Sequence, residues 1–268
     1  MKSNYLPTDY QTFIATSRYA RWLEEEGRRE TWGETVGRYM TNIVSPWLTP
    51  TIEEEICDAI LSLEVMPSMR SLMTAGKSSA RDNTCMYNCS YLPVDDPKAF
   101  DEAMFILLCG TGVGFSVERQ FITKLPEVPS LFESDTTIVI KDSKEGWAKG
   151  LRQVLALLWA GEIPKWDVSK VRPAGARLKT FGGRASGPAP LVDLFNFSVS
   201  TFKAAQGRKL SSIECHDLMC KIGEVVVVGG VRRSAMISLS NLSDDRMRHA
   251  KSGNWWELNG QRALANNS

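Results

Sequence analysis

The sequence predicts an α/β protein with a helical N-terminal extension. Residues 1–66 carry apolar side chains at helical spacing, whereas from Met66 onward short apolar segments alternate with stretches long enough for helices. Neither an internal repeat nor a low-complexity linker divides the 268 residues. Because alternating strands and helices are typical of layered α/β folds, we expect residues 67–268 to form one α/β body.

Two capping-box patterns mark helix starts in the extension. Thr31 with Glu34 and Thr51 with Glu54 have the spacing at which a hydroxyl and a carboxylate satisfy the first amides of a helix. Pro67 ends the third predicted helix, because proline cannot continue one. We expect residues 1–66 to pack against the rest of the chain. The alternative is that they also shape an effector or cofactor surface.

The body is predicted to begin with a strand, a helix and a second strand. Tyr87, Cys89 and Tyr91 alternate as in a strand, residues 99–108 are helical up to Gly110, and residues 113–117 are again strand-like. Further helices are predicted over residues 143–159, 189–205 and 211–228, and further strands over 235–239 and from Arg262 onward. Residues 225–228 are four valines, which favour a strand as an alternative to the end of the last helix.

The composition is that of an ordinary globular protein, with 43% hydrophobic and 24% charged residues. A formal net charge of +1 provides no global basic field, so we expect neither nucleic acid nor a membrane surface as a partner. No apolar run reaches the roughly 18 residues of a membrane span. The N-terminus has no signal-peptide core, so we expect a cytoplasmic protein.

Six cysteines are too sparse for a secreted disulfide scaffold. Cys85 and Cys89 could join Cys215 and Cys220 in a four-thiolate zinc site, but neither pair has the spacing or the glycine-rich knuckle of such ligands. With two histidines in the chain, a histidine-rich metal site or a serine–histidine triad is poorly supported. We therefore expect no metal site.

The first of three glycine-rich loops is Gly110-Thr-Gly112-Val-Gly114. It lacks the lysine and hydroxyl ending of a phosphate-binding P-loop, and it precedes a strand rather than a helix. It is either a helix end with a tight turn or a place where a sugar or phosphate approaches the bare backbone.

The second loop, Gly229-Gly230-Val-Arg232-Arg233-Ser234-Ala235, joins glycines that permit rearrangement to arginines suited to bidentate phosphate contacts. The alternative is a solvated turn whose arginines pair with surface carboxylates such as Asp244 or Asp245. A third loop, residues 180–188, again combines glycines with an arginine and a hydroxyl. Three such loops favour a ligand with several negative charges.

Eight segments of the chain resemble, in the same order and from end to end, the monomeric class II ribonucleoside-triphosphate reductases. They are residues 28–32, 67–72, 88–89, 112–117, 142–147, 181–188, 230–235 and 266–268. The resemblance implies a ten-stranded α/β barrel, of which residues 67–268 supply the first half. It also implies adenosylcobalamin as cofactor, a nucleoside triphosphate as substrate and a deoxynucleotide as effector.

Individual roles follow from the same resemblance. Cys89 matches the barrel cysteine that ends each turnover in a disulfide, and an external dithiol reductant such as thioredoxin would reduce it again. Ser68, Ser90, Gly112 and Gly114 fall where the family holds the substrate. The loop that relays effector identity to the substrate corresponds to Gly229, Gly230, Arg232, Arg233 and Ser234. The resemblance assigns no cobalamin-binding residue.

The sequence departs from the family in one respect. The radical-forming cysteine of the family lies in an Asn-Pro-Cys-Gly-Glu segment, and these 268 residues contain no such segment. We therefore expect the N-terminal part of a reductase, from a split, intein-interrupted or truncated gene, that is inactive without a complementary C-terminal half. The alternative is a non-catalytic nucleotide-binding or regulatory module derived from such an enzyme.

Overall fold

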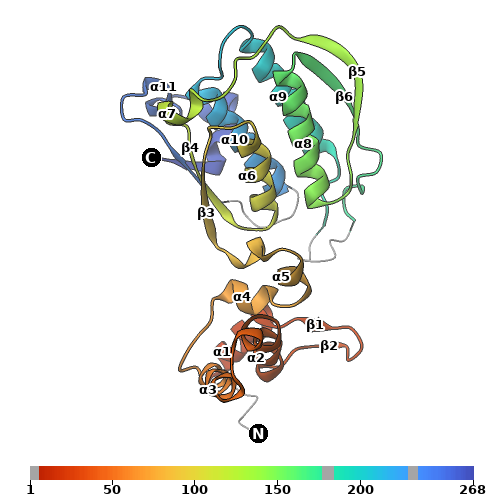
Figure 1. The fold of residues 1–268 in the computed structure, drawn as a ribbon, viewed down its shortest axis with the longest axis vertical. Coiled ribbons are helices and arrows are strands. Elements are labelled where there is room, and N and C mark those ends of the chain that lie inside the picture. The colour runs from red at the N-terminus through yellow and green to blue at the C-terminus, as the bar shows by residue number, and fades with distance from the viewer. Residues whose placement is uncertain (1–5, 177–183, 229–234) are drawn as a thin grey trace. The chain divides into compact units, whose positions relative to one another are not determined.

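The structure is a computed structural model that describes residues 6–176, 184–228 and 235–268 (Figure 1). The chain divides into two compact units, Met1–Asn88 and Cys89–Ser268. None of the helices within the described residues is both long enough and apolar enough to cross a membrane.

The first unit is mostly helical. Its elements are α1 Asp9–Ile14, η1 Ala15–Tyr19, β1 Trp22–Leu23, β2 Arg28–Arg29, α2 Trp32–Tyr39, η2 Met40–Val44, η3 Ser45–Trp47, α3 Pro50–Leu61, α4 Met69–Thr74, α5 Lys77–Arg81 and η4 Asn83–Met86. Trp32, Val36 and Ile60 form its apolar core with Leu72. The antiparallel pair β1–β2 was not predicted, and the unit continues beyond residue 66 through α4, α5 and η4.

One of the two predicted capping boxes is present. The Thr31 hydroxyl accepts from the Glu34 amide while the Glu34 carboxylate accepts from the Thr31 amide, so the prediction for α2 is confirmed. The box predicted at Thr51 is wrong, because α3 begins at Pro50 and Thr51 is already its second residue. The fixed φ of proline suits the first position of a helix, and Thr49 therefore takes the N-cap position.

The second unit contains the α/β arrangement predicted from the sequence. Its elements are β3 Cys89–Pro93, α6 Lys98–Leu108, β4 Gly112–Ser116, α7 Arg119–Ile122, β5 Phe132–Val139, α8 Lys144–Trp159, β6 Glu162–Asp167, α9 Ala189–Ala204, α10 Ser212–Val228, β7 Met236–Leu239, α11 Asp245–Arg248, α12 Trp255–Leu258, η5 Gly260–Leu264 and β8 Ala265–Asn267. The four long predicted helices are confirmed within a residue at each end. The valine run belongs to α10, so the strand alternative for it is wrong.

Four strands form one parallel sheet in the order β3-β4-β7-β8. The register aligns Tyr91, Gly114, Ile237 and Asn266 in one row across it. The strand predicted to begin near Arg262 is present, but it starts three residues later. Arg262 lies in η5, where its guanidinium pairs with Asp217, and β8 starts at Ala265.

Helices α6 and α10 pack against one side of this sheet, and α8 and α9 pack against these two helices in turn (Figure 1). Arg152 on α8 forms a salt bridge with the buried Asp101 on α6, with a distance of 2.7 Å from Nη2 to Oδ2. Strands β5 and β6 form a separate parallel pair that runs along α8 and was missing from the prediction. The sheet and this helical layer together determine which side chains of β3, β4 and β7 stay accessible.

Candidate functional site

The two faces of the parallel sheet differ in what covers them. Leu92, Val113 and Phe115 point toward α6 and α10 and are buried. Their neighbours on the other face are accessible, with Tyr91 55% exposed and Ile237 41% exposed. Successive side chains of a strand point to opposite faces, so Cys89, Tyr91, Gly114 and Ile237 belong to the same side. We call this side the open face; its residues are Cys89, Tyr91, Gly112, Gly114, Ile237 and Asn266.

Cys89 is the first residue of β3 and pairs with Gly112 across the sheet. It is the only exposed cysteine of the six, all of which lie in the described residues. Burial raises the pKa of the Cys220 thiol to about 12 and that of Cys215 still further. Because the thiolate is the reactive form and access is required, the geometry leaves Cys89 best placed for thiol chemistry.

Ser90 lies on the other side of the strand from Cys89. Its hydroxyl donates to the Gly112 carbonyl at 2.9 Å and so ties β3 to β4. Its expected contact with substrate stays a prediction.

The glycines of the first loop serve two different purposes. Gly110 follows the C-terminus of α6 with φ of +83°, and its amide donates to Leu107, so at this residue the helix-end alternative is correct. Gly112 and Gly114 instead lie inside β4. A Cβ on Gly114 would come within 3.3 Å of the Ile237 Cγ2 and 3.7 Å of the Tyr91 Cδ2. The absent side chain therefore keeps a shallow gap between Tyr91 and Ile237 on the open face.

Ser68 belongs to the first unit, where it caps α4. Its hydroxyl accepts from the Ser71 amide at 3.1 Å. Cys89, Gly112 and Gly114 belong to the second unit, and a role of Ser68 in substrate binding stays a prediction. Residues 229–234, with Gly229, Gly230, Arg232, Arg233 and Ser234, lie outside the described residues.

Within the described part of the chain, no group of three or more histidine, cysteine and carboxylate side chains is arranged to hold a metal. Cys215 and Cys220 are both buried in α10. Cys85 belongs to the first unit.

A buried polar network attaches the last strand to α10. Arg262 makes two hydrogen bonds to the Asp217 carboxylate, of 2.7 and 2.6 Å, and His216 lies between Asp217 and Asn267 of β8. Burial alone would raise the pKa of Asp217, but hydrogen bonds from His216 and Arg262 lower it. The charged carboxylate is thus retained, and η5 and β8 are held in place at the edge of the sheet.

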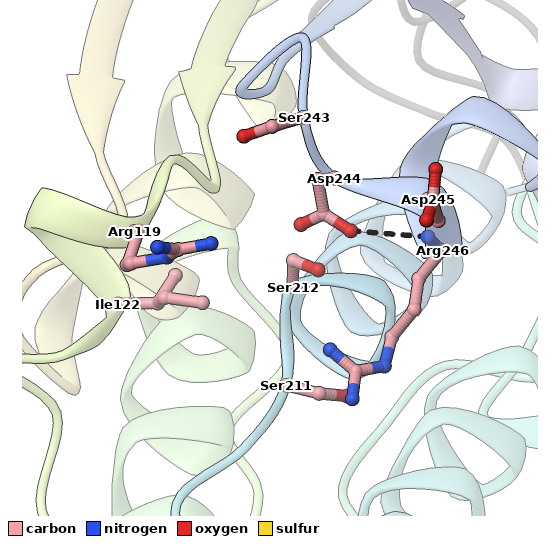
Figure 2. A pocket seen from close by; sticks show the side chains of 8 residues that line it. All are labelled: Arg119, Ile122, Ser211, Ser212, Ser243, Asp244, Asp245 and Arg246. Atoms are coloured by element: carbon pink, nitrogen blue, oxygen red, sulfur yellow. Dashed lines mark hydrogen bonds between the residues drawn. The ribbon is translucent and has the colours of Figure 1, made fainter.

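A pocket beyond the C-terminal ends of β4 and β7 was not anticipated from the sequence. Figure 2 shows its lining: Arg119, Ile122, Ser211, Ser212, Ser243, Asp244, Asp245 and Arg246. Its volume is about 460 Å³. These residues come from three separate stretches of the chain, and only their spatial convergence distinguishes them from ordinary surface residues. The exposed pair Tyr91 and Ile237 was also missed, although strand alternation places both on the side of Cys89.

Comparison with known proteins finds that the chain is similar to one family. Residues 129–200, which contain β5, α8 and β6, match the family described as the insertion domain of B12-dependent ribonucleotide reductase. The adenosylcobalamin-dependent ribonucleoside-triphosphate reductase of Lactobacillus acidophilus is 27% identical over 303 residues, covering 84% of this chain and 40% of the relative. Its counterpart in Lactobacillus leichmannii is 28% identical over 298 residues, with the same two coverages. These alignments are longer than the chain itself, so the relatives contain segments that it lacks.

The fold is shared with a solved structure as well. The crystal structure of a B12-dependent (class II) ribonucleotide reductase matches 96% of this chain and 45% of its own length, with a TM-score of 0.80 and 23% sequence identity. The resemblance inferred from the sequence is confirmed: the chain is similar over most of its length to adenosylcobalamin-dependent ribonucleoside-triphosphate reductases. It spans about two fifths of the length of these relatives.

Proposed function

We propose that this chain forms part of an adenosylcobalamin-dependent reductase that converts ribonucleoside triphosphates to deoxyribonucleoside triphosphates. One observation carries the proposal: the only exposed thiol of the chain begins a strand beside side-chain-free Gly112 and Gly114, on the open face of a sheet whose fold and sequence match such reductases. The alternative of a non-catalytic nucleotide-binding module accounts for the glycines but not for the position of the thiol.

The open face supports the barrel proposed from the sequence. Four parallel strands are covered by helices on one side and leave Tyr91 and Ile237 accessible on the other. A barrel strand alternates between residues that point inward and residues that point toward surrounding helices. In the proposed arrangement, the open face is the inner wall of a ten-stranded α/β barrel, and the remaining strands come from the part of the enzyme that these 268 residues do not include.

Cys89 would supply one of the two thiols that reduce the substrate. Replacement of the 2′-hydroxyl by hydrogen releases water and requires two electrons and two protons. Two thiols provide both when they form a disulfide, and an external dithiol such as thioredoxin then reduces that disulfide. The partner cysteine would need its Cα within roughly 4.4–6.8 Å of the Cys89 Cα. An exposed residue at a strand end can accept such a partner without distortion of the sheet.

The substrate would lie over Gly112 and Gly114. Ser90 would act through β4, because its hydroxyl holds the Gly112 carbonyl, and the role of Ser68 in substrate binding rests on the family resemblance alone. The absence of side chains allows a ribose to approach the backbone of β4 closely. One loop would relay the identity of the bound deoxynucleotide effector to the substrate site, because its sequence matches the corresponding loop of the family. Its residues include Gly229, Gly230, Arg232, Arg233 and Ser234.

Adenosylcobalamin, when bound, supplies the radical that starts the reaction. Two pockets among the described residues measure about 460 and 290 Å³, and a corrin ring with its nucleotide and adenosyl groups is larger than either. These pockets therefore do not fit the cofactor. We assign no cobalamin contact to this chain.

Reconstitution tests the proposal. Residues 1–268 would be mixed with a polypeptide that carries the family's Asn-Pro-Cys-Gly-Glu segment, adenosylcobalamin, a ribonucleoside triphosphate and a dithiol. We expect deoxynucleotide formation only when both polypeptides are present. Activity of residues 1–268 alone, or a reconstituted complex that binds nucleotides but forms no product, would contradict the proposal; the second result would favour the nucleotide-binding module.

A further inference from the structure

The pocket at the C-terminal edge of the sheet contains a constellation that the reductase chemistry does not use. Arg119 begins α7 directly after β4, and Arg246 lies in α11 beyond β7. Cys89, in contrast, begins β3. In a parallel sheet all strands start at the same edge, so the pocket and Cys89 lie at opposite edges.

The carboxylates around this pocket already have partners. Asp244 caps α11 by accepting from the amides of Arg246 and Met247. Asp245 pairs with Arg248 at 3.2 Å from Nη1 to Oδ1. Both carboxylates are therefore bound by amides or by a cation of α11 itself.

The Glu214 carboxylate is also occupied. It accepts from the amide and the hydroxyl of Ser211 at 2.8 Å each and forms two 2.7 Å hydrogen bonds with Arg208. The nearest acidic group of α10 is thus bound by a cation outside the pocket lining.

The two arginines that line the pocket have no such partners. Neither the Arg119 nor the Arg246 guanidinium forms a hydrogen bond or ion pair within residues 6–176, 184–228 and 235–268. In Figure 2 the Arg119 guanidinium extends toward the centre of the pocket, opposite Asp244 and the α11 end that carries Arg246. The Arg246 side chain ends beside Ser211 in the same view, so the lining holds two forks of five donors each that have no partner among the described residues.

Ser212 provides a second, independent indication of a ligand. It is 2% exposed, it lines the pocket, and its Oγ has no hydrogen-bond partner in the described structure. A buried hydroxyl without a partner is costly, and native proteins satisfy nearly all such groups. A ligand oxygen inside the pocket would satisfy it.

Ser212 is also the first residue of α10, a helix of 17 residues. The Ser211 carbonyl accepts from the Cys215 amide at 3.0 Å, so Ser211 occupies the N-cap position and the helix begins at the pocket. The first amides of a helix and its dipole favour a negatively charged group at this end.

We propose that this pocket binds a phosphate group through Arg119, Arg246 and Ser212 at the N-terminus of α10. The volume of about 460 Å³ admits a phosphate together with part of a larger molecule. The source is either inorganic phosphate or the phosphate chain of a nucleotide. The site is separate from the open face and does not depend on the proposed reductase activity.

Calorimetric titration of the full chain tests the site. Inorganic phosphate and a nucleoside triphosphate would be titrated in separate arms at constant ionic strength, with chloride as reference. Arg119→Gln and Arg246→Gln should each weaken phosphate binding by roughly tenfold, because each removes a charge-assisted hydrogen bond. Ser212→Ala should weaken it less and raise the melting temperature of the phosphate-free chain, because the hydroxyl without a partner is gone.

Lys165→Gln is the matched control, since it removes one positive charge from β6, where Lys165 pairs with Asp135, and neither residue lines the pocket. Its phosphate affinity should stay within about twofold of the parent, as expected for a distant, screened charge. Tighter binding of the triphosphate than of phosphate, lost in both arginine variants, identifies a nucleotide as the source; equal binding identifies phosphate alone. No phosphate binding by the parent chain, or equal binding by parent, Arg119→Gln and Arg246→Gln, overturns the proposal.

Discussion

The covered and open faces of the parallel sheet are formed by the same strands, yet they contain different kinds of residue. Toward α6 and α10 the strands present Leu92, Phe115 and Met236, which are almost fully buried. Toward the open face the same strands present a thiol, two glycines and a partly exposed Ile237. Packing explains the first set, because large apolar side chains fill the space beneath the helices. Packing does not explain the second set, whose mostly small side chains leave the Cys89 thiol accessible.

The largest expected effect is on the open face, and it is on activity. In the reconstituted enzyme, Cys89→Ser should abolish multiple turnover with a dithiol reductant, because one of the two reducing thiols is missing. Cys57→Ser is the control and should leave turnover unchanged. Both would be measured as deoxynucleotide formed per enzyme over many turnovers. Sustained turnover by Cys89→Ser would show that the open face takes no part in the reduction.

On the covered face the expected effect is on stability. Phe115→Ala should lower the free energy of unfolding by about 3–5 kcal/mol, because it removes a fully buried aromatic side chain from the core. Ile237→Ala, on the open face, should cost about 1 kcal/mol, since that side chain keeps much of its exposure. Denaturant unfolding of both variants measures the difference. Equal losses would show that the open face is packed in solution.

Gly114→Val sharpens the comparison because it adds a side chain to the open face alone. The new Cβ meets a flexible Ile237 methyl group at 3.3 Å, so we expect the free energy of unfolding to change by less than about 1 kcal/mol. Substrate affinity of the reconstituted enzyme should fall by about tenfold, equivalent to about 1.4 kcal/mol, because the gap over β4 is filled. Gly260→Val is the control, since nothing lies within 4 Å of its added Cβ. Unchanged affinity in Gly114→Val would place the substrate elsewhere.

The smallest expected effect concerns the helix that covers the sheet. Burial alone would raise the pKa of Glu214, but hydrogen bonds from Arg208 and Ser211 hold it down at about 2. A carboxylate whose pKa is lower in the folded state stabilises the fold above its unfolded pKa of roughly 4.3, and this contribution is lost as pH falls toward 2.

We therefore expect Glu214→Gln to reduce the acid-induced loss of unfolding free energy between pH 6 and pH 3 by on the order of 1 kcal/mol, after allowance for solvent screening of this partly exposed pair. Denaturant unfolding at both pH values measures it. Glu257→Gln, an exposed residue of α12, is the control. An unchanged pH dependence would show that the Arg208 pair does not stabilise the start of α10.

The sequence by itself determined the local elements and the relationship. Apolar periodicity and Ser143 at a helix start sufficed for α6 and α8, because helix formation depends on neighbouring residues. Alternation around Cys89 identified β3, and ordered short motifs identified the reductase resemblance. Such patterns also predicted the thiol chemistry of Cys89, although they could not show that it is the most accessible cysteine.

Only the tertiary structure decided which residues meet. The pairing of Cys89 with Gly112, the gap between Tyr91 and Ile237, and the pocket of Arg119, Ser212 and Arg246 all join residues far apart in the chain. Local propensity also left the valine run of α10 open between helix and strand and put the start of β8 too early, because packing against neighbouring elements outweighs intrinsic preference there. Long-range contacts of this kind leave no periodic signal in the sequence, because they depend on how whole elements pack.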